Sequence, residues 1–224
     1  MIAIPSLIWT EIKFLLPWWA VTVATSYLVL LATSASKYSD YPLMCLGLGC
    51  ALLAAQAFSR AIPPGETDTS APEQAWTVRM SAVSITSLAA AAVFSLISAA
   101  FRASSGLPTP LLAVVTLTPA LGIVPYLTMR TGKPFAAVVL AAFIVGLIKI
   151  ASCIVVRIVY GADAQADGYM AGDWQTAKLM ISLFWIGTVI ISVVSAVECR
   201  YRFNALLTAA PPGSGLAVAL SQND

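Results

Sequence analysis

Long apolar runs, separated by short polar stretches, recur along almost the whole chain. Of the 224 residues, 59% are hydrophobic and only 10% are charged, whereas a typical soluble domain has about 25% charged residues. So few charges cannot cover the water-exposed surface of a soluble domain of this size. Runs of roughly 20 apolar residues are long enough to cross a bilayer as helices. The sequence therefore predicts an all-α integral membrane protein.

The positions of the apolar runs predict six transmembrane helices. Their ranges are Trp18–Ala35, Pro42–Phe58, Met80–Ala100, Leu111–Met129, Phe135–Val159 and Leu179–Val197. In the fourth span Pro119 and Pro125 release backbone carbonyls and favour a broken helix of the kind found in transport paths, although prolines are also common in ordinary membrane helices. We divide the chain into an interfacial helix (1–16), a six-span domain (17–202) and a flexible cytoplasmic tail (203–224).

The segment before the first span, Ile4–Leu16, is predicted to be an amphipathic helix. Its apolar residues recur at helical spacing, with Glu11 and Lys13 among the polar residues between them. Trp9 suits the membrane interface, and Pro17 is expected to end the helix. We expect this helix to lie along the membrane surface. The alternative is that the segment is the beginning of the first span.

The sequence predicts no catalytic or metal site and no cofactor. It contains no histidine, which excludes histidine-ligated haem, HExxH zinc sites and imidazole bases. Asp163 and Asp167 lack the further aspartates of a metal cluster, and a solvated loop is expected there. The four cysteines form no CxxC pair, and a net charge of +2 is too small to indicate nucleic-acid binding.

ATP hydrolysis by a Walker-type loop is also excluded. The nearest string, Arg130-Thr131-Gly132-Lys133, continues into Pro134 where that motif has Ser or Thr, and it lacks the leading glycine. If ATP drives the protein, a separate subunit must supply the ATPase.

Lys149 is the only charge well inside a predicted span. An intramembrane charge is a candidate for contacting an anionic group in a translocation path. The alternative is that its side chain extends to the outer surface, because it lies in the outer half of its span.

Basic residues near the span ends predict a cytoplasmic location for both termini. With the N-terminus inside, the inner set is Lys13, Arg60, Arg79, Arg130, Lys133, Arg200 and Arg202. The outer set is smaller and comprises Lys37, Arg102, Arg157 and Lys178. We expect a multi-pass protein of the plasma membrane.

These elements together resemble the ABC-2 class of ABC transporter permeases. That family has an interfacial helix ending near an acidic–basic pair, here Glu11 and Lys13, and then six spans. A cytoplasmic coupling segment joins its second and third spans, which here corresponds to residues 59–79. The string that carries the resemblance is Gly65-Glu66-Thr67-Asp68-Thr69-Ser70-Ala71-Pro72, followed by Trp76 and Arg79. Polar residues stand between Thr67 and Pro72 where the family has apolar ones.

The resemblance implies a permease subunit, not itself an enzyme, that forms a homo- or heterodimer among membrane lipids and is driven by a separate cytoplasmic ABC ATPase. Export is the expected direction. Glu66, Glu73 and Arg79 would pair with charges on the ATPase, and Trp76 would anchor the segment at the interface. A second hypothesis is a non-catalytic membrane anchor or scaffold of a larger complex.

Overall fold

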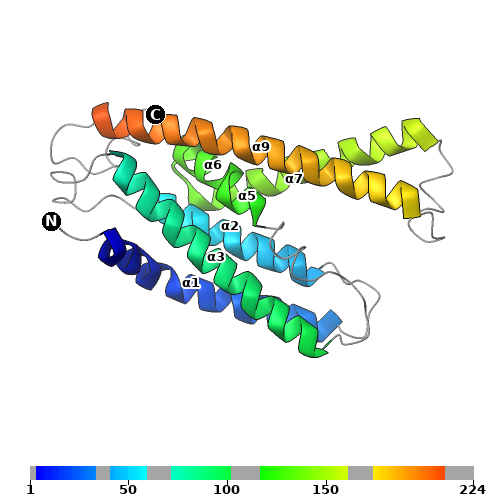
Figure 1. Ribbon diagram of the computed structural model, residues 1–224, viewed down its shortest axis with the longest axis horizontal. Coiled ribbons are helices and arrows are strands. Elements are labelled where there is room, and N and C mark those ends of the chain that lie inside the picture. Colours follow the sequence, from blue (N-terminus) through cyan, green and yellow to red (C-terminus); the bar gives the residue numbers. More distant parts are fainter. Residues whose placement is uncertain (1–3, 34–40, 60–71, 102–116, 161–173, 210–224) are drawn as a thin grey trace.

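The computed structural model describes residues 4–33, 41–59, 72–101, 117–160 and 174–209, and every regular element within these ranges is a helix (Figure 1). The elements are α1 (Ile4–Thr33), α2 (Tyr41–Ser59), α3 (Pro72–Phe101), α5 (Thr118–Leu121), α6 (Ile123–Thr131), α7 (Pro134–Tyr160) and α9 (Trp174–Ala209).

Five of these helices are long and apolar enough to cross a membrane. The candidate spans are Pro5–Ala32, Pro42–Ser59, Ala75–Ile97, Pro134–Tyr160 and Leu179–Phe203. This finding supports the predicted multi-pass, all-α membrane protein. The fourth predicted span is not among them, because its described part forms two short helices, α5 and α6, of four and nine residues.

The prolines of the fourth predicted span lie where two helices begin. Pro119 is in the first turn of α5, and Pro125 is in the first turn of α6. Proline fits the first turn because the N–H groups there have no intrahelical acceptor. Gly122 separates the two helices, and a Cβ at this position would overlap the backbone of Ser192 on α9. The predicted broken helix is therefore confirmed, with its break at Gly122.

The expected helix end at Pro17 is wrong. Pro17 lies inside the continuous 30-residue helix α1, although proline costs the helix the hydrogen bond to the carbonyl of Lys13. Packing of α1 along α2 and α3 stabilises the helix on both sides of this position. Most of the predicted apolar face of residues 4–16 does pack inward, since Leu15 is fully buried and Ile8 and Ile12 pack against the core. The exceptions are Glu11, which is 9% exposed, and Leu16, which is 54% exposed.

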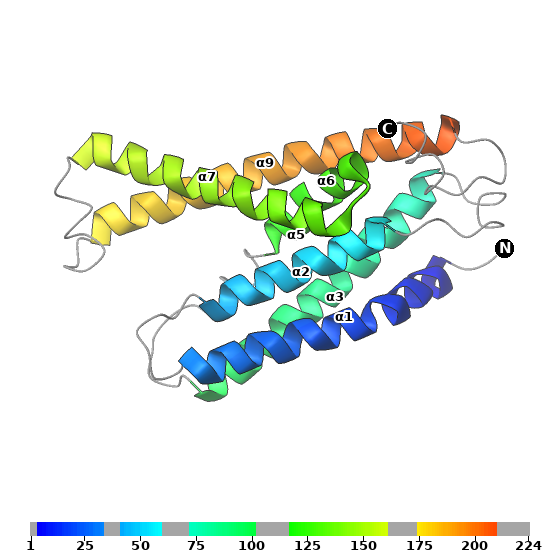
Figure 2. The ribbon, with the colours of Figure 1, turned by 180° about the vertical axis from the view of Figure 1, so that it is seen from behind.

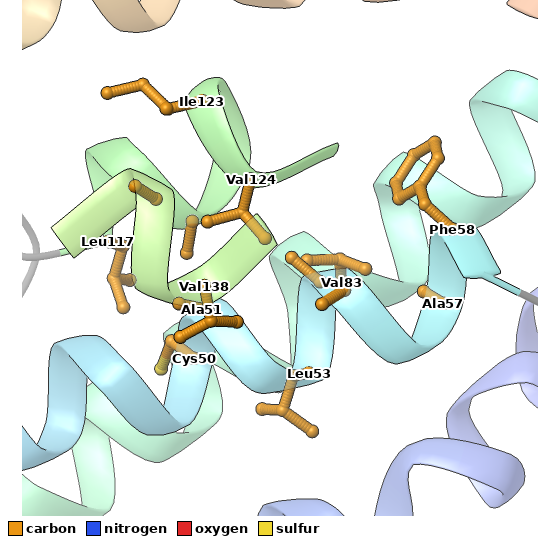
Figure 3. Close-up of a cluster of buried hydrophobic side chains, with 14 of the residues drawn as sticks. Cys50, Ala51, Leu53, Ala57, Phe58, Val83, Leu117, Ile123, Val124 and Val138 are labelled. Carbon is orange, nitrogen blue, oxygen red and sulfur yellow. The ribbon is translucent and has the colours of Figure 1, made fainter. Parts of the chain in front are cut away.

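α2 lies at the centre of the bundle. It packs against α1 and α3 on one side and against α5, α6 and α7 on the other (Figures 1 and 2). Figure 3 shows Ala51, Leu53 and Phe58 of α2 in the same buried cluster as Val124 of α6 and Val138 of α7. Small residues allow this close packing in a membrane bundle. Gly49 of α2, for example, directly abuts the Thr22 side chain of α1.

Buried hydroxyl groups are largely satisfied within their own helices. Six of them donate to the carbonyl four residues earlier, at 2.8–2.9 Å: Thr22, Ser26, Thr86, Thr128, Ser152 and Thr188. This local bond meets the need of a hydroxyl for a partner where water is absent. These residues therefore fit the interior of the bundle without forming polar links between helices.

One end of the bundle collects four helix ends. α1 and α3 begin there, and α2 and α9 finish there (Figure 1). We call it the Phe203 end, after the aromatic residue at its centre. α9 continues through this end to Ala209, past residue 203, where the sequence predicted the start of a flexible tail.

Candidate functional site

Three aromatic side chains from three helices meet at the Phe203 end. Phe58 lies in the last turn of α2, Trp76 near the start of α3 and Phe203 near the end of α9. The ring centroids are 5.2 Å apart for Phe58–Trp76, 5.6 Å for Trp76–Phe203 and 6.3 Å for Phe58–Phe203. These are favourable tilted and edge-to-face contacts. The aromatic cluster (Phe58, Trp76 and Phe203) therefore joins α2, α3 and α9 at one level.

Arg79 adds a buried positive charge to this cluster. It follows Trp76 by three residues on α3, so the two side chains share a helix face. Its side chain is 3% exposed, and the guanidinium carbon lies 6.0 Å from the centroid of the Phe203 ring. This geometry allows a cation–π interaction that offsets part of the cost of burying the charge.

Glu11 places a buried negative charge at the same end. It lies in the first turns of α1, which packs along α3, and it is 9% exposed. The other two residues predicted for the interfacial helix face outward: Trp9 is 57% exposed, and the Nζ of Lys13 lies 5.7 Å from the centroid of its ring.

The structure brings together Trp76 and Arg79 of the predicted coupling segment and places Glu11 at the same end. The helix that contains the third predicted span begins earlier than expected: α3 starts at Pro72 and includes Glu73, Trp76 and Arg79, and its candidate span begins at Ala75. Proline at the first position of a helix explains this start. The buried position of Arg79 turns its guanidinium towards the chain's own core, so a contact with an ATPase stays a prediction. Glu66 and Thr67 lie outside the described residues.

The candidates for a translocation path do not converge. Lys149 is exposed on α7, which fits both a contact in a path between two chains and the alternative that its side chain extends to the outer surface. Pro125 is buried in the α5–α6 region, and Pro119 is partly buried beside it. A role for these three residues in transport stays a prediction.

Phe58 and Phe203 are site residues that were not predicted from the sequence. The apolar pattern placed Phe58 at the end of the second span and Phe203 in the tail. Both are fully buried. The signal that was present is that Phe58 ends the second predicted span and Phe203 follows shortly after the sixth, on the same predicted side as Trp76 and Arg79.

The cluster is suited to holding helices in register rather than to making or breaking bonds. It consists of three aromatic rings, with the Arg79 guanidinium beside the Phe203 ring. Within the described ranges, no group of three or more His, Cys, Asp or Glu residues could hold a metal ion. The arrangement therefore offers a mechanical connection between α2, α3 and α9.

Comparison with known proteins leaves the family open: no protein-family model, no curated protein and no solved structure matches this chain. The resemblance to ABC-2 permeases thus depends on the predicted interfacial helix with Glu11 and Lys13, the span pattern and the residues of the segment 59–79.

Proposed function

We propose that the chain is the transmembrane permease subunit of an ATP-driven transporter of the ABC-2 type, which works with a separate cytoplasmic ATPase. The observation that supports this most is the course of α3. It begins at Pro72, inside the segment expected to meet the ATPase, and within two turns its side chains contact Phe58 and Phe203. A force on the start of α3 would therefore reach α2 and α9 through direct contacts.

In this proposal the chain crosses the membrane six times. α3 ends away from the Phe203 end, so the chain must return before α7 begins, and α5 with α6 forms the described part of that fourth crossing (Figure 2). The excess of basic residues on the predicted inner side supports a cytoplasmic position for the Phe203 end. Two such chains would enclose a path, and ATP-driven closure of the ATPase subunits would rock them between two states.

The proposal divides the coupling residues into two groups. Glu66 and Glu73 would contact the ATPase, with Thr67 and Pro72 shaping the segment between the spans. Trp76 and Arg79 would transmit the resulting movement, because they contact the chain's own core. Mutations can then separate loss of contact with the ATPase from loss of transmission of its movement into the helix bundle.

The test is purification in mild detergent, followed by identification of the proteins that accompany the chain. The proposal expects an ATPase with a Walker loop, and Glu66→Arg with Glu73→Arg should reduce its recovery at least tenfold. Lys149→Gln, a charge change far from the segment, is the matched control and should leave recovery unchanged. Recovery of an unrelated enzyme in place of an ATPase would overturn the proposal and support the scaffold hypothesis.

Transmission is tested on the purified complex. In the wild type, ATP with vanadate should change amide hydrogen exchange in α1 and α9. Arg79→Gln should retain the ATPase but lose this response, whereas Arg79→Lys, which keeps a cation near the Phe203 ring, should retain part of it. An undiminished response in Arg79→Gln would contradict the transmitting role.

A further inference from the structure

A second group of basic side chains gathers around Tyr126 of α6. The Nη1 of Arg130 donates to the Tyr126 hydroxyl at 3.0 Å. From α9, the guanidinium carbon of Arg202 lies 5.9 Å from the centroid of the Tyr126 ring. Two guanidinium groups that are distant in sequence are thus held on one aromatic side chain.

Lys133 extends this group across the turn between α6 and α7. The Thr131 hydroxyl accepts a hydrogen bond from the Lys133 N–H at 3.3 Å. Gly132 closes α6 with φ +62, a left-handed conformation that glycine adopts without strain, and its N–H donates to the Thr128 carbonyl at 2.9 Å. The turn is therefore well fixed, and the Lys133 side chain is exposed. We call Arg130, Lys133 and Arg202 the Tyr126 basic patch.

The patch lies at the boundary of the apolar spans. Arg202 is at the end of the candidate span Leu179–Phe203, and Lys133 directly precedes the candidate span Pro134–Tyr160. Two aromatic side chains beside it are largely exposed, Phe135 at 74% and Tyr201 at 72%. Exposed aromatic residues at span ends are typical of the lipid head-group region.

The patch carries more positive than negative charge. All three basic side chains are exposed, and the carboxylate that contacts them is Glu198, whose Oε1 lies 3.0 Å from the Nε of Arg202. Both side chains of this ion pair are 48% exposed. Such a pair is weak and screened by salt, so the patch keeps a net attraction for anions.

We propose that the Tyr126 basic patch binds the phosphate head group of an acidic phospholipid in the surrounding bilayer. Each planar guanidinium group can donate two parallel hydrogen bonds to two oxygens of one phosphate, and the lysine ammonium adds a compact positive charge. The position at the head-group level favours a lipid over an acidic protein as the occupant. This proposal does not depend on the proposed transport function.

The test is titration of the detergent-solubilised chain with phosphatidylglycerol and, separately, with phosphatidylcholine, with bound lipid counted by native mass spectrometry. The wild type should bind phosphatidylglycerol more tightly. Each basic residue near a membrane surface contributes about a fivefold gain, so Arg130→Gln with Lys133→Gln should raise the Kd for the first phosphatidylglycerol about 25-fold.

Three further variants distinguish a built site from general attraction to basic residues. Arg157→Gln removes an exposed cation in the last turn of α7 and should leave the Kd unchanged. Arg130→Lys with Lys133→Arg keeps the charge and should retain binding. Tyr126→Phe keeps the ring but removes the partner of Arg130, and should weaken binding about twofold to fivefold.

Two results would overturn the proposal. One is equal affinity of the wild type for the two lipids, which would leave an acidic protein as the occupant to be sought. The other is an equal loss of affinity in Arg157→Gln and in the double glutamine variant.

Discussion

Single aromatic residues near the end of α9 contribute unequally to the bundle. Tyr201 and Phe203 are separated by one residue, yet Tyr201 is 72% exposed and Phe203 is fully buried. Phe203 contacts Phe58 and Trp76, and Arg79 approaches its ring. The helical turn between the two positions sets this difference, since it directs their side chains to different faces.

Truncation of the buried ring should therefore be costly. Phe203→Ala is expected to lower the free energy of unfolding by about 3 kcal/mol, because it opens a cavity at the junction of three helices. Tyr201→Ala, the matched control on the same turn, should change it by less than about 0.5 kcal/mol. Unfolding in mixed detergent micelles measures both. Equal losses in the two variants would contradict the arrangement of α9.

Individual elements depend on contacts that a sequence pattern does not contain. The apolar runs predicted most of the long helices, and Pro119 with Pro125 predicted a broken element. Pro17 has the same local chemistry, but α1 packs against α2 and α3 and continues as a helix through it. The burial of Glu11 could not be predicted for the same reason. It depends on the packing of α1 against α3, and the sequence predicted a later start for that element than Pro72.

The α5–α6 break depends on Gly122. A Cβ there would overlap the Ser192 backbone, which cannot move aside as a flexible side chain can. Gly122→Ala is expected to lower the free energy of unfolding by about 1–3 kcal/mol. Gly146→Ala on α7 is the control, since a methyl group added there would meet no atom within 4 Å. The melting temperature of each variant in detergent measures the difference, and a stable Gly122→Ala variant would contradict the close contact with α9.

At the scale of the whole molecule, composition alone predicted the class of protein, whereas the convergence of helix ends needed the structure. Phe58 and Phe203 are far apart in sequence, and apolar periodicity says only that each is near a span end. Their contact depends on how α2, α3 and α9 cross, and α9 reaches this place by packing against α3, α5, α6 and α7.

The arrangement predicts which ends of the helices share a side of the membrane. In a cysteine-free background, Ser6→Cys on α1 and Ala205→Cys on α9 should react with a membrane-impermeant maleimide from the same side. Tyr160→Cys at the far end of α7 should react from the opposite side (Figure 1). Labelling of intact and of opened vesicles measures this. Reaction of the first two from different sides would contradict an even number of crossings.

The unequal lengths of the spans have a consequence for the bilayer itself. The 25-residue span of α9 is about 37 Å long, whereas the 18-residue span of α2 is about 27 Å long, at ~1.5 Å per residue. A hydrocarbon core of about 30 Å matches neither. The short helix is enclosed by its neighbours, and the long one is largely exposed, so lipid thickness would act on the tilt of α9. In a thicker bilayer, α9 should tilt less from the membrane normal. This change of tilt would move the Phe203 ring relative to the rings that it contacts.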